Sequence, residues 1–220
     1  MERQKKIAVI LSGCGVNDGS EIHEAVLTLY FIMRNGAKYE IFAPDIPQQH
    51  VVNHLTGEIM PEGRNVLIES ARIARGKIVP LVDFDAAHFD AVIFPGGFGV
   101  AKNLSDYAFK GSDITVNKDV EKVIKDMVSL GKPIGSLCIS PVLIAKVLGK
   151  VELTVGQDLE TIQDLEKMGA EHISTTHGEV IIDERYNIVS SPCYMLDANI
   201  VQVGEGAENV VKTILKILGS

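Results

Sequence analysis

Short apolar runs alternate along the chain with segments in which apolar residues recur every three or four positions. The runs at 6–11, 90–94 and 133–137 predict buried strands, and the run at 38–43 predicts a second strand after the first helix. The periodic segments predict helices at 21–35, 65–74, 117–130, 141–148, 158–168 and 207–218. Strands that alternate with helices in this way are typical of βαβ units, so we expect an α/β protein with a mostly parallel sheet.

The remaining segments are shorter or less regular. Two runs at 179–183 and 187–191 flank Glu184-Arg-Tyr and predict a late hairpin. Residues 44–64 hold three prolines and little periodicity, which indicates loops, and 103–115 is expected to be an irregular insertion. Because no repeat or linker interrupts the pattern, we expect a single domain over 1–220.

Composition narrows the classes of function. Of the 220 residues, 46% are hydrophobic and 23% are charged, which is ordinary for a globular protein. No apolar run approaches the roughly 18 residues of a membrane span, so we expect no membrane partner. A net charge of −8 without a basic cluster argues against a nucleic-acid partner. The first apolar run ends at Ser12 and Gly13, too soon for a signal peptide, so a cytoplasmic location is expected.

The three cysteines, Cys14, Cys138 and Cys193, are widely spaced and odd in number. This pattern argues against a disulfide framework. The chain has no CxxC pair, so we expect neither a structural zinc nor another metal. Reduced thiols remain, one of which is a candidate for reactivity.

Cys138 is the main candidate for chemistry. It falls between the strand at 133–137 and the helix at 141–148, within Gly135-Ser-Leu-Cys138-Ile-Ser-Pro141. In such a nucleophile elbow the side chain faces the amide end of the following helix, which favours a thiolate and lowers its pKa. Amide groups there can also hold an oxyanion of a substrate. The plainer interpretation is a buried structural cysteine.

Acidic residues open the first predicted helix. Glu21 and Glu24 lie at the carboxyl edge of the predicted sheet, where ligands of parallel sheets bind. Either carboxyl group could share a proton with Cys138. Either could instead complement the helix dipole, and the residue pattern alone does not choose between them.

Two glycine-rich segments follow strands. Pro95-Gly-Gly-Phe-Gly99 can bring backbone amides close to a substrate, although it is also an ordinary tight turn. Ser12-Gly-Cys-Gly-Val-Asn-Asp-Gly19 approaches a dinucleotide fingerprint, but its third glycine comes one residue late. Nearby carboxylates also disfavour a pyrophosphate at this place. We therefore expect no dinucleotide and no other cofactor.

Together these motifs resemble the ThiJ/PfpI superfamily, which shares a flavodoxin-like three-layer sandwich with class I glutamine amidotransferase domains. The resemblance spans almost the whole chain and rests on the early glutamate, on the PGGFGxxxNLS segment at 95–105 and on the GxxCxxP elbow. The segments 11–16, 18–24 and 53–58 are similar to the ElbB-type subgroup, also called sigma cross-reacting proteins, whose namesake is described as a glyoxalase. The resemblance also implies a homodimer.

Residue by residue, the resemblance implies that Cys138 is the nucleophile and Glu24 its carboxyl partner. Gly97 and Ile139 become candidates for the oxyanion hole. Many superfamily members have a histidine after the elbow helix, where this chain reads Leu153-Thr-Val-Gly-Gln-Asp158, and Ser140 stands where many have glycine. His54 or His177 could substitute, although each also fits an ordinary loop histidine. Cys14 and Cys193 are possible pocket residues.

The leading hypothesis is a cofactor-free glyoxalase-type lyase that converts small dicarbonyls such as glyoxal to 2-hydroxy acids, with possible deglycase activity. Cys138 would attack the aldehyde while Glu24 moves protons. The alternative is a non-enzymatic oxidative-stress sensor or binding protein that uses Cys138 oxidation. A third and weaker hypothesis is an amidotransferase-like module that releases ammonia for a partner.

Overall fold

A seven-stranded sheet forms the centre of the molecule in this computed structural model, which describes residues 3–219. Its strand order is β3-β2-β1-β4-β5-β9-β8. All neighbours pair in parallel except β8 and β9, which form the predicted hairpin. The strands are β1 (Lys6–Ile10), β2 (Lys38–Ala43), β3 (Val79–Pro80), β4 (Ala91–Phe94), β5 (Ile134–Leu137), β8 (Ile181–Asp183) and β9 (Ile188–Ser191).

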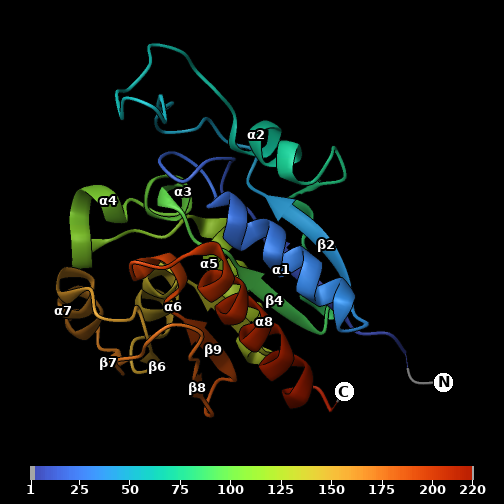
Figure 1. Cartoon of the computed structure of the whole chain (residues 1–220). Coiled ribbons are helices and arrows are strands. Elements are labelled where there is room, and N and C mark those ends of the chain that lie inside the picture. The colour runs from blue at the N-terminus through green and yellow to red at the C-terminus, as the bar shows by residue number, and fades with distance from the viewer. Residues whose placement is uncertain (1–2, 220) are drawn as a thin grey trace.

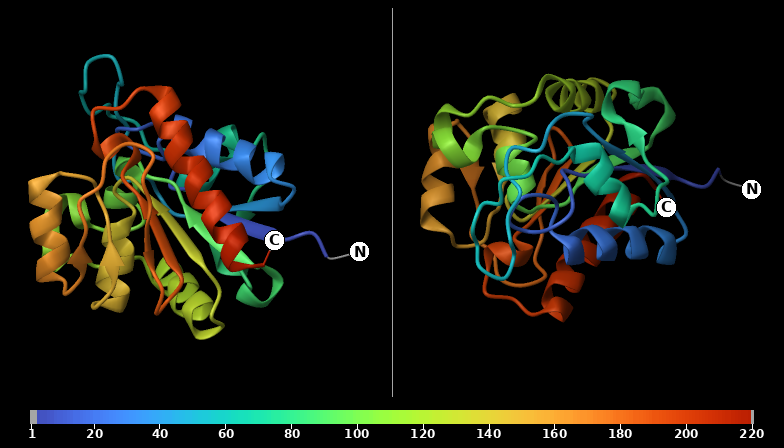
Figure 2. Two further views of the ribbon diagram at one scale, coloured as in Figure 1. Left: turned by 60° about the horizontal axis from the view of Figure 1, so that its bottom comes forward. Right: turned by 90° about the horizontal axis from the view of Figure 1, so that it is seen from above.

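Helices cover both faces of this sheet. Helices α1 and α8 pack side by side on one face, and in the left view of Figure 2 the red helix α8 lies across the central strands. The α-helices are α1 (Ile22–Arg34), α2 (Val66–Ile73), α3 (Phe98–Lys102), α4 (Tyr107–Lys110), α5 (Lys118–Ser129), α6 (Pro141–Leu148), α7 (Leu159–Lys167) and α8 (Ile200–Ile217). Short 3-10 turns are Leu81–Asp83, Ala86–His88, Gly111–Asp113 and Cys193–Met195.

Two apolar clusters fill the space between the sheet and its helices. Side chains alternate along β1, so Ile7 and Val9 join the cluster under α1 and α8, while Ala8 and Ile10 join the cluster under α5 and α6. A sheet buried on both faces explains why its strands appear in the sequence as continuous apolar runs. The fold is a flavodoxin-like α/β sandwich, as predicted.

The structure differs from the sequence predictions at several places. Helix α8 begins at Ile200, seven residues before the predicted start at 207, with Asn199 and Gln202 forming a capping box. The insertion at 103–115 contains the helix α4 and a 3-10 turn. A second, two-stranded sheet pairs β6 (Glu152–Leu153) with β7 (Glu171–His172), both of which the sequence pattern left out.

Four chain segments meet at the carboxyl edge of the central strands. The loop after β1 leads into α1, the loop after β4 leads into α3, Cys138 follows β5, and Cys193 follows β9. These strands are neighbours in the sheet, so their ends bring together residues far apart in the chain. None of the helices within residues 3–219 is long and apolar enough to span a membrane.

Candidate functional site

Cys138 lies at a sharp turn between β5 and α6, as the sequence predicts. Its φ of 59° is in the left-handed region, which a residue with a Cβ adopts only when the surroundings enforce it. Two hydrogen bonds fix the turn: Cys138 N donates to Ser191 O at 3.0 Å, and Ser140 Oγ donates to Pro95 O at 2.8 Å. The elbow is therefore tied to both neighbouring strands.

The Cys138 thiol is buried, with 7% of the residue exposed. Burial raises its pKa well above the usual value, and Glu24 and Cys193 add to the rise. The backbone N–H groups of Gly97 and Ile139 act in the opposite direction. The prediction of a lowered pKa is therefore wrong, because desolvation of the sulfur outweighs the amides that face it.

Glu24 is completely buried in the first turn of α1. Its Oε2 accepts a hydrogen bond from Gly96 N at 2.8 Å, and its Oε1 accepts one from Tyr194 N at 3.3 Å. Burial, reinforced by the nearby Glu21, raises the pKa of Glu24 to about 8. The carboxyl group is thus mostly protonated at neutral pH although it accepts two amide bonds.

The structure separates the roles of the two acidic residues. Glu21 caps α1, where its Oε2 accepts from Glu24 N at 2.7 Å, and its own N donates to Gly96 O at 2.9 Å. Glu24 instead lies beside the sulfur, since a Cβ built on Gly96 would fall 2.7 Å from Glu24 Oε2 and 2.9 Å from Cys138 Sγ. Of the two carboxyl groups, Glu24 is the one that lies beside the Cys138 sulfur, and Glu21 supports the loop around it.

Gly97 places an amide at the sulfur. It has a φ of 100° and precedes α3, and a Cβ there would fall 2.3 Å from Glu21 N and 2.4 Å from Gly19 O. Only glycine fits this close approach of two backbones. The amides of Gly97 and Ile139 therefore flank Cys138 at the positions predicted for an oxyanion hole.

The other two cysteines occupy different surroundings. Cys193 is 4% exposed, has a φ of 43°, and lies close enough to Glu24 and Cys138 to interact electrostatically with both. Burial raises the pKa of Cys14, and among its charged neighbours Arg72 of α2 has the largest effect, lowering that pKa. The structure brings Cys193 to the site and places Cys14 near α2.

Neither predicted histidine contacts the thiol. His54 accepts a hydrogen bond from Asn17 N, in the loop after β1, and contacts Val52 O of its own loop, while His177 contacts Asp197 O at 3.1 Å. Within residues 3–219 no hydrogen bond joins an imidazole to the Cys138 sulfur.

An exposed aromatic pair lies next to the site. His23 Nδ1 lies 2.7 Å from the hydroxyl of Tyr194, whose backbone N donates to Glu24. Sequence reasoning missed this pair, although His23 precedes Glu24 and Tyr194 follows Cys193 directly in the chain.

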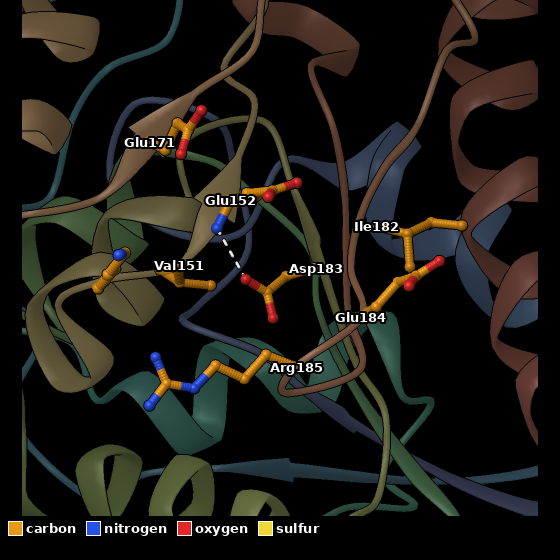
Figure 3. Close-up of a pocket in the computed structure, with 8 residues that line it drawn as sticks. Val151, Glu152, Glu171, Ile182, Asp183, Glu184 and Arg185 are labelled. Carbon is orange, nitrogen blue, oxygen red and sulfur yellow. Dashed lines mark hydrogen bonds between the residues drawn. The ribbon is translucent and has the colours of Figure 1, made fainter.

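A hollow of about 410 Å³ lies elsewhere, at the edge of the sheet where β6, β7 and β8 meet. Figure 3 shows its charged lining, in which Asp183 accepts a 2.9 Å bond from Glu152 N. None of the site residues described above contributes to it. In the described part of the chain, no group of three or more His, Cys, Asp or Glu residues is placed to hold a metal ion.

The chain is similar to proteins of one known family. Residues 5–194 match the model of the DJ-1/PfpI family. The human "Glutamine amidotransferase-like class 1 domain-containing protein 3, mitochondrial" is 46% identical over 224 residues, covering 97% of this chain and 84% of its own length. The zebrafish "ES1 protein, mitochondrial" is 38% identical, covering 96% of this chain and 85% of its own length.

Solved structures share the fold. An isoprenoid biosynthesis protein with an amidotransferase-like domain from Ehrlichia chaffeensis superposes with a TM-score of 0.90 at 34% identity, covering 96% of this chain and 99% of its own. DJ-1beta from Drosophila melanogaster, at 17% identity, has a TM-score of 0.55 over 98% of each chain and shows the fold alone.

The relatives correct one expectation and confirm another. The expected cytoplasmic location is contradicted, because the relatives at 38–46% identity over nearly the whole chain are all named mitochondrial. Cellular location depends on targeting rather than on the fold, so the residue pattern of a globular domain does not predict it. The match over 5–194 and the near-complete coverage by these relatives confirm the predicted superfamily: the chain belongs to the DJ-1/PfpI family.

Proposed function

We propose that this protein is a cofactor-free glyoxalase-type enzyme that converts small dicarbonyls such as glyoxal to 2-hydroxy acids. Cys138 is the nucleophile and Glu24 carries protons. The observation that supports the proposal is the buried Glu24 carboxyl beside the Cys138 sulfur, whose pKa of about 8 lets it both donate and accept protons near neutral pH.

The first half of the reaction needs a nucleophile and a proton carrier. The ionised fraction of Glu24 accepts the Cys138 thiol proton as Sγ attacks an aldehyde carbon. The carbonyl oxygen becomes an alkoxide that the N–H groups of Gly97 and Ile139 stabilise, and it then takes the proton from Glu24. The product is a hemithioacetal, and Glu24 is again a carboxylate.

The second half moves two protons to the neighbouring carbon and its oxygen. Glu24 removes the C–H proton of the hemithioacetal carbon and passes it to the neighbouring carbonyl oxygen, giving an enediol. It then accepts the hydroxyl proton of the former aldehyde carbon and delivers a proton to the adjacent carbon, giving a thioester. Water then adds to the thioester, the C–S bond breaks, and the sulfur leaves as a thiolate that is protonated again. Glyoxal and water thus become glycolate and a proton, with no external oxidant or reductant.

The amidotransferase hypothesis has less support. The Cys-His-Glu arrangement needs an imidazole at the thiol to protonate the leaving ammonia. In the described structure His54 and His177 bond to loop atoms instead, and Glu24 is the acid that borders the sulfur. The glyoxalase reaction needs only one proton carrier, which matches the groups at hand.

The test is glyoxal consumption and glycolate formation by the purified protein and three variants. We expect Cys138→Ser and Glu24→Gln to lower kcat/KM by at least about a hundredfold, as for loss of a nucleophile or a general base. Cys14→Ser is the matched control and should keep the wild-type rate. The wild-type rate should rise with pH up to about 8, because the ionised Glu24 is the proton acceptor.

Two outcomes would remove the proposal. Undiminished glyoxal consumption by Cys138→Ser would show that the thiol is not the nucleophile. A wild-type protein that is inert toward glyoxal, yet gains oxygen selectively on Cys138 at a low peroxide dose, would instead support the oxidation sensor.

A further inference from the structure

Cys193 is a second buried thiol that the proposed reaction does not use. It lies two residues after the end of β9, while Cys138 directly follows the neighbouring strand β5. We propose that Cys193 is a resolving thiol: when a peroxide oxidises Cys138, Cys193 forms a reversible disulfide with it. This inference does not depend on the dicarbonyl reaction.

The backbone brings the two cysteines close. Strands β5 and β9 run in parallel with Leu137 opposite Ser191, and Cys138 N donates to Ser191 O at 3.0 Å. Cys138 is one residue beyond this register and Cys193 is two. Neighbouring strands lie about 4.8 Å apart, and a disulfide joins Cα atoms roughly 4.4–6.8 Å apart, so the spacing at the ends of adjacent strands suits a bridge.

The side-chain surroundings connect the two thiols through one carboxyl group. Glu24 Oε2 bonds to Gly96, against which the Cys138 sulfur packs, and Oε1 bonds to Tyr194, the residue after Cys193. Each sulfur interacts electrostatically with Glu24, and Cys193 also contributes to the raised pKa of Cys138. The carboxyl group therefore borders both thiols.

The Cys193 sulfur can turn toward its neighbour. The sulfur lies against α8, where it donates a hydrogen bond to Val203 O at 4.0 Å, and it also contacts the Ser191 side chain. A Cβ on Gly206 would come within 3.0 Å of it. Hydrogen bonds from a thiol are weak, so rotation about the Cα–Cβ bond costs little hydrogen bonding. Both cysteines belong to one apolar cluster of buried residues.

The chemistry balances with a peroxide as the oxidant. The Cys138 sulfur attacks one peroxide oxygen, the O–O bond breaks, and a sulfenic acid and water form. The Cys193 sulfur then attacks the Cys138 sulfur, the S–O bond breaks, and a second water leaves with the Cys193 proton. Glu24 is positioned to carry that proton from thiol to leaving oxygen. A dithiol reductant reverses the bridge.

Intact-mass measurement during a hydrogen peroxide titration tests the proposal. We expect the wild-type mass to fall by about 2 Da, the loss of two hydrogens, and dithiothreitol to restore it. Proteolysis under non-reducing conditions should yield one peptide pair that joins Cys138 to Cys193. Under the same dose Cys193→Ser should instead gain about 32 Da on Cys138, the sulfinic acid, while Cys14→Ser should behave as wild type.

The wild-type peptide map tests for the bridge between Cys138 and Cys193 even if a variant folds poorly. A sulfinic acid on wild-type Cys138 without the loss of hydrogens would overturn the proposal. A bridge that includes Cys14, or one between two chains, would overturn it as well. Loss of glyoxal consumption is a separate readout, so the bridge can form in a protein that proves inactive toward dicarbonyls.

Discussion

Glu24 holds a carboxyl group where ionisation is costly, and this cost links the site to the stability of the protein. The side chain has no exposed surface, and burial together with Glu21 raises its pKa from 4.5 to about 8. Between these two values the unfolded chain is ionised at Glu24 while the native protein keeps the proton. The native state is therefore favoured at low pH, and this contribution is lost as the pH rises toward 8.

This imbalance predicts the stability of Glu24→Gln. Relative to wild type, the variant should gain unfolding free energy by about 1.4 kcal/mol per pH unit between roughly pH 5 and pH 8, because glutamine never ionises. Urea unfolding at several pH values measures the difference. Glu184→Gln alters an exposed carboxyl group and should show no such gain. Parallel curves for wild type and Glu24→Gln would show that Glu24 is ionised in the native state.

The short helix α3 shows how one backbone position sets the site at the scale of an element. Gly97 precedes α3 with a φ of 100°, and its Cα lies against the backbone of Gly19 and Glu21. Its amide faces Cys138 only while this contact is kept. The loop after β1 and the start of α3 therefore hold one donor of the proposed oxyanion hole in place.

Gly97→Ala should therefore damage both stability and activity. The new Cβ adds a backbone clash at 2.3 Å to the strain of a positive φ, so we expect a loss of more than about 2 kcal/mol in unfolding free energy. Gly36→Ala is the matched control: its φ is 81°, but no atom lies within 4 Å of the new Cβ. It should cost only about 1 kcal/mol and leave glyoxal consumption unchanged. Equal losses in urea unfolding would contradict the clash.

The sequence predicts best the elements whose own residues show a clear apolar run or helical periodicity. The runs of β1, β4 and β5 are apolar because both faces of each strand are buried, so their pattern is continuous. Helix α8 starts earlier than predicted because Gly204 and Gly206 weaken its helical pattern. Position 206 requires glycine because the Ser191 and Cys193 side chains occupy the space where a Cβ would lie. Strands β6 and β7 have two residues each, too few for a periodicity to appear.

Across the whole molecule, the sheet brings together site residues that are remote in the chain. The elbow at Cys138 and the early glutamate could be predicted, because a strand-to-helix turn and a carboxyl edge follow from the order of elements. The direction of the Cys138 pKa shift could not be predicted, because it depends on how deeply the sulfur is buried and on Glu24 and Cys193, which the fold brings next to it. The choice of Cys193 over Cys14 as a neighbour likewise depends on the pairing of β5 with β9.

The homodimer implied by the family resemblance stays a prediction, and the outer face of α1 indicates where it would form. An apolar stripe follows one side of this helix, opposite its packed face, with Ile22, Val26, Tyr30 and Met33 each 42–55% exposed. The spacing of four, four and three residues keeps these side chains on one surface. Exposed apolar surface of this kind favours contact with another protein, and a twofold dimer pairs the same patch on both copies.

A charge in the stripe should separate the two copies. We expect light scattering to give twice the 23.9 kDa chain mass for wild type, and the single-chain mass for Val26→Glu, because burying an unpaired carboxylate opposes association. Leu55→Glu makes the same chemical change at a residue that is 96% exposed on a loop away from α1, and it should stay dimeric. If both variants keep the wild-type mass, the stripe is not the contact. If wild type is monomeric at micromolar concentration, the chain does not form the dimer that its resemblance implies.

The same contact should affect activity, because α1 carries Glu24, the proposed proton carrier, in its first turn. A dimer through this face would pack the helix that holds Glu24 against the second copy. Loss of the dimer in Val26→Glu should therefore lower glyoxal consumption, while Leu55→Glu should retain it.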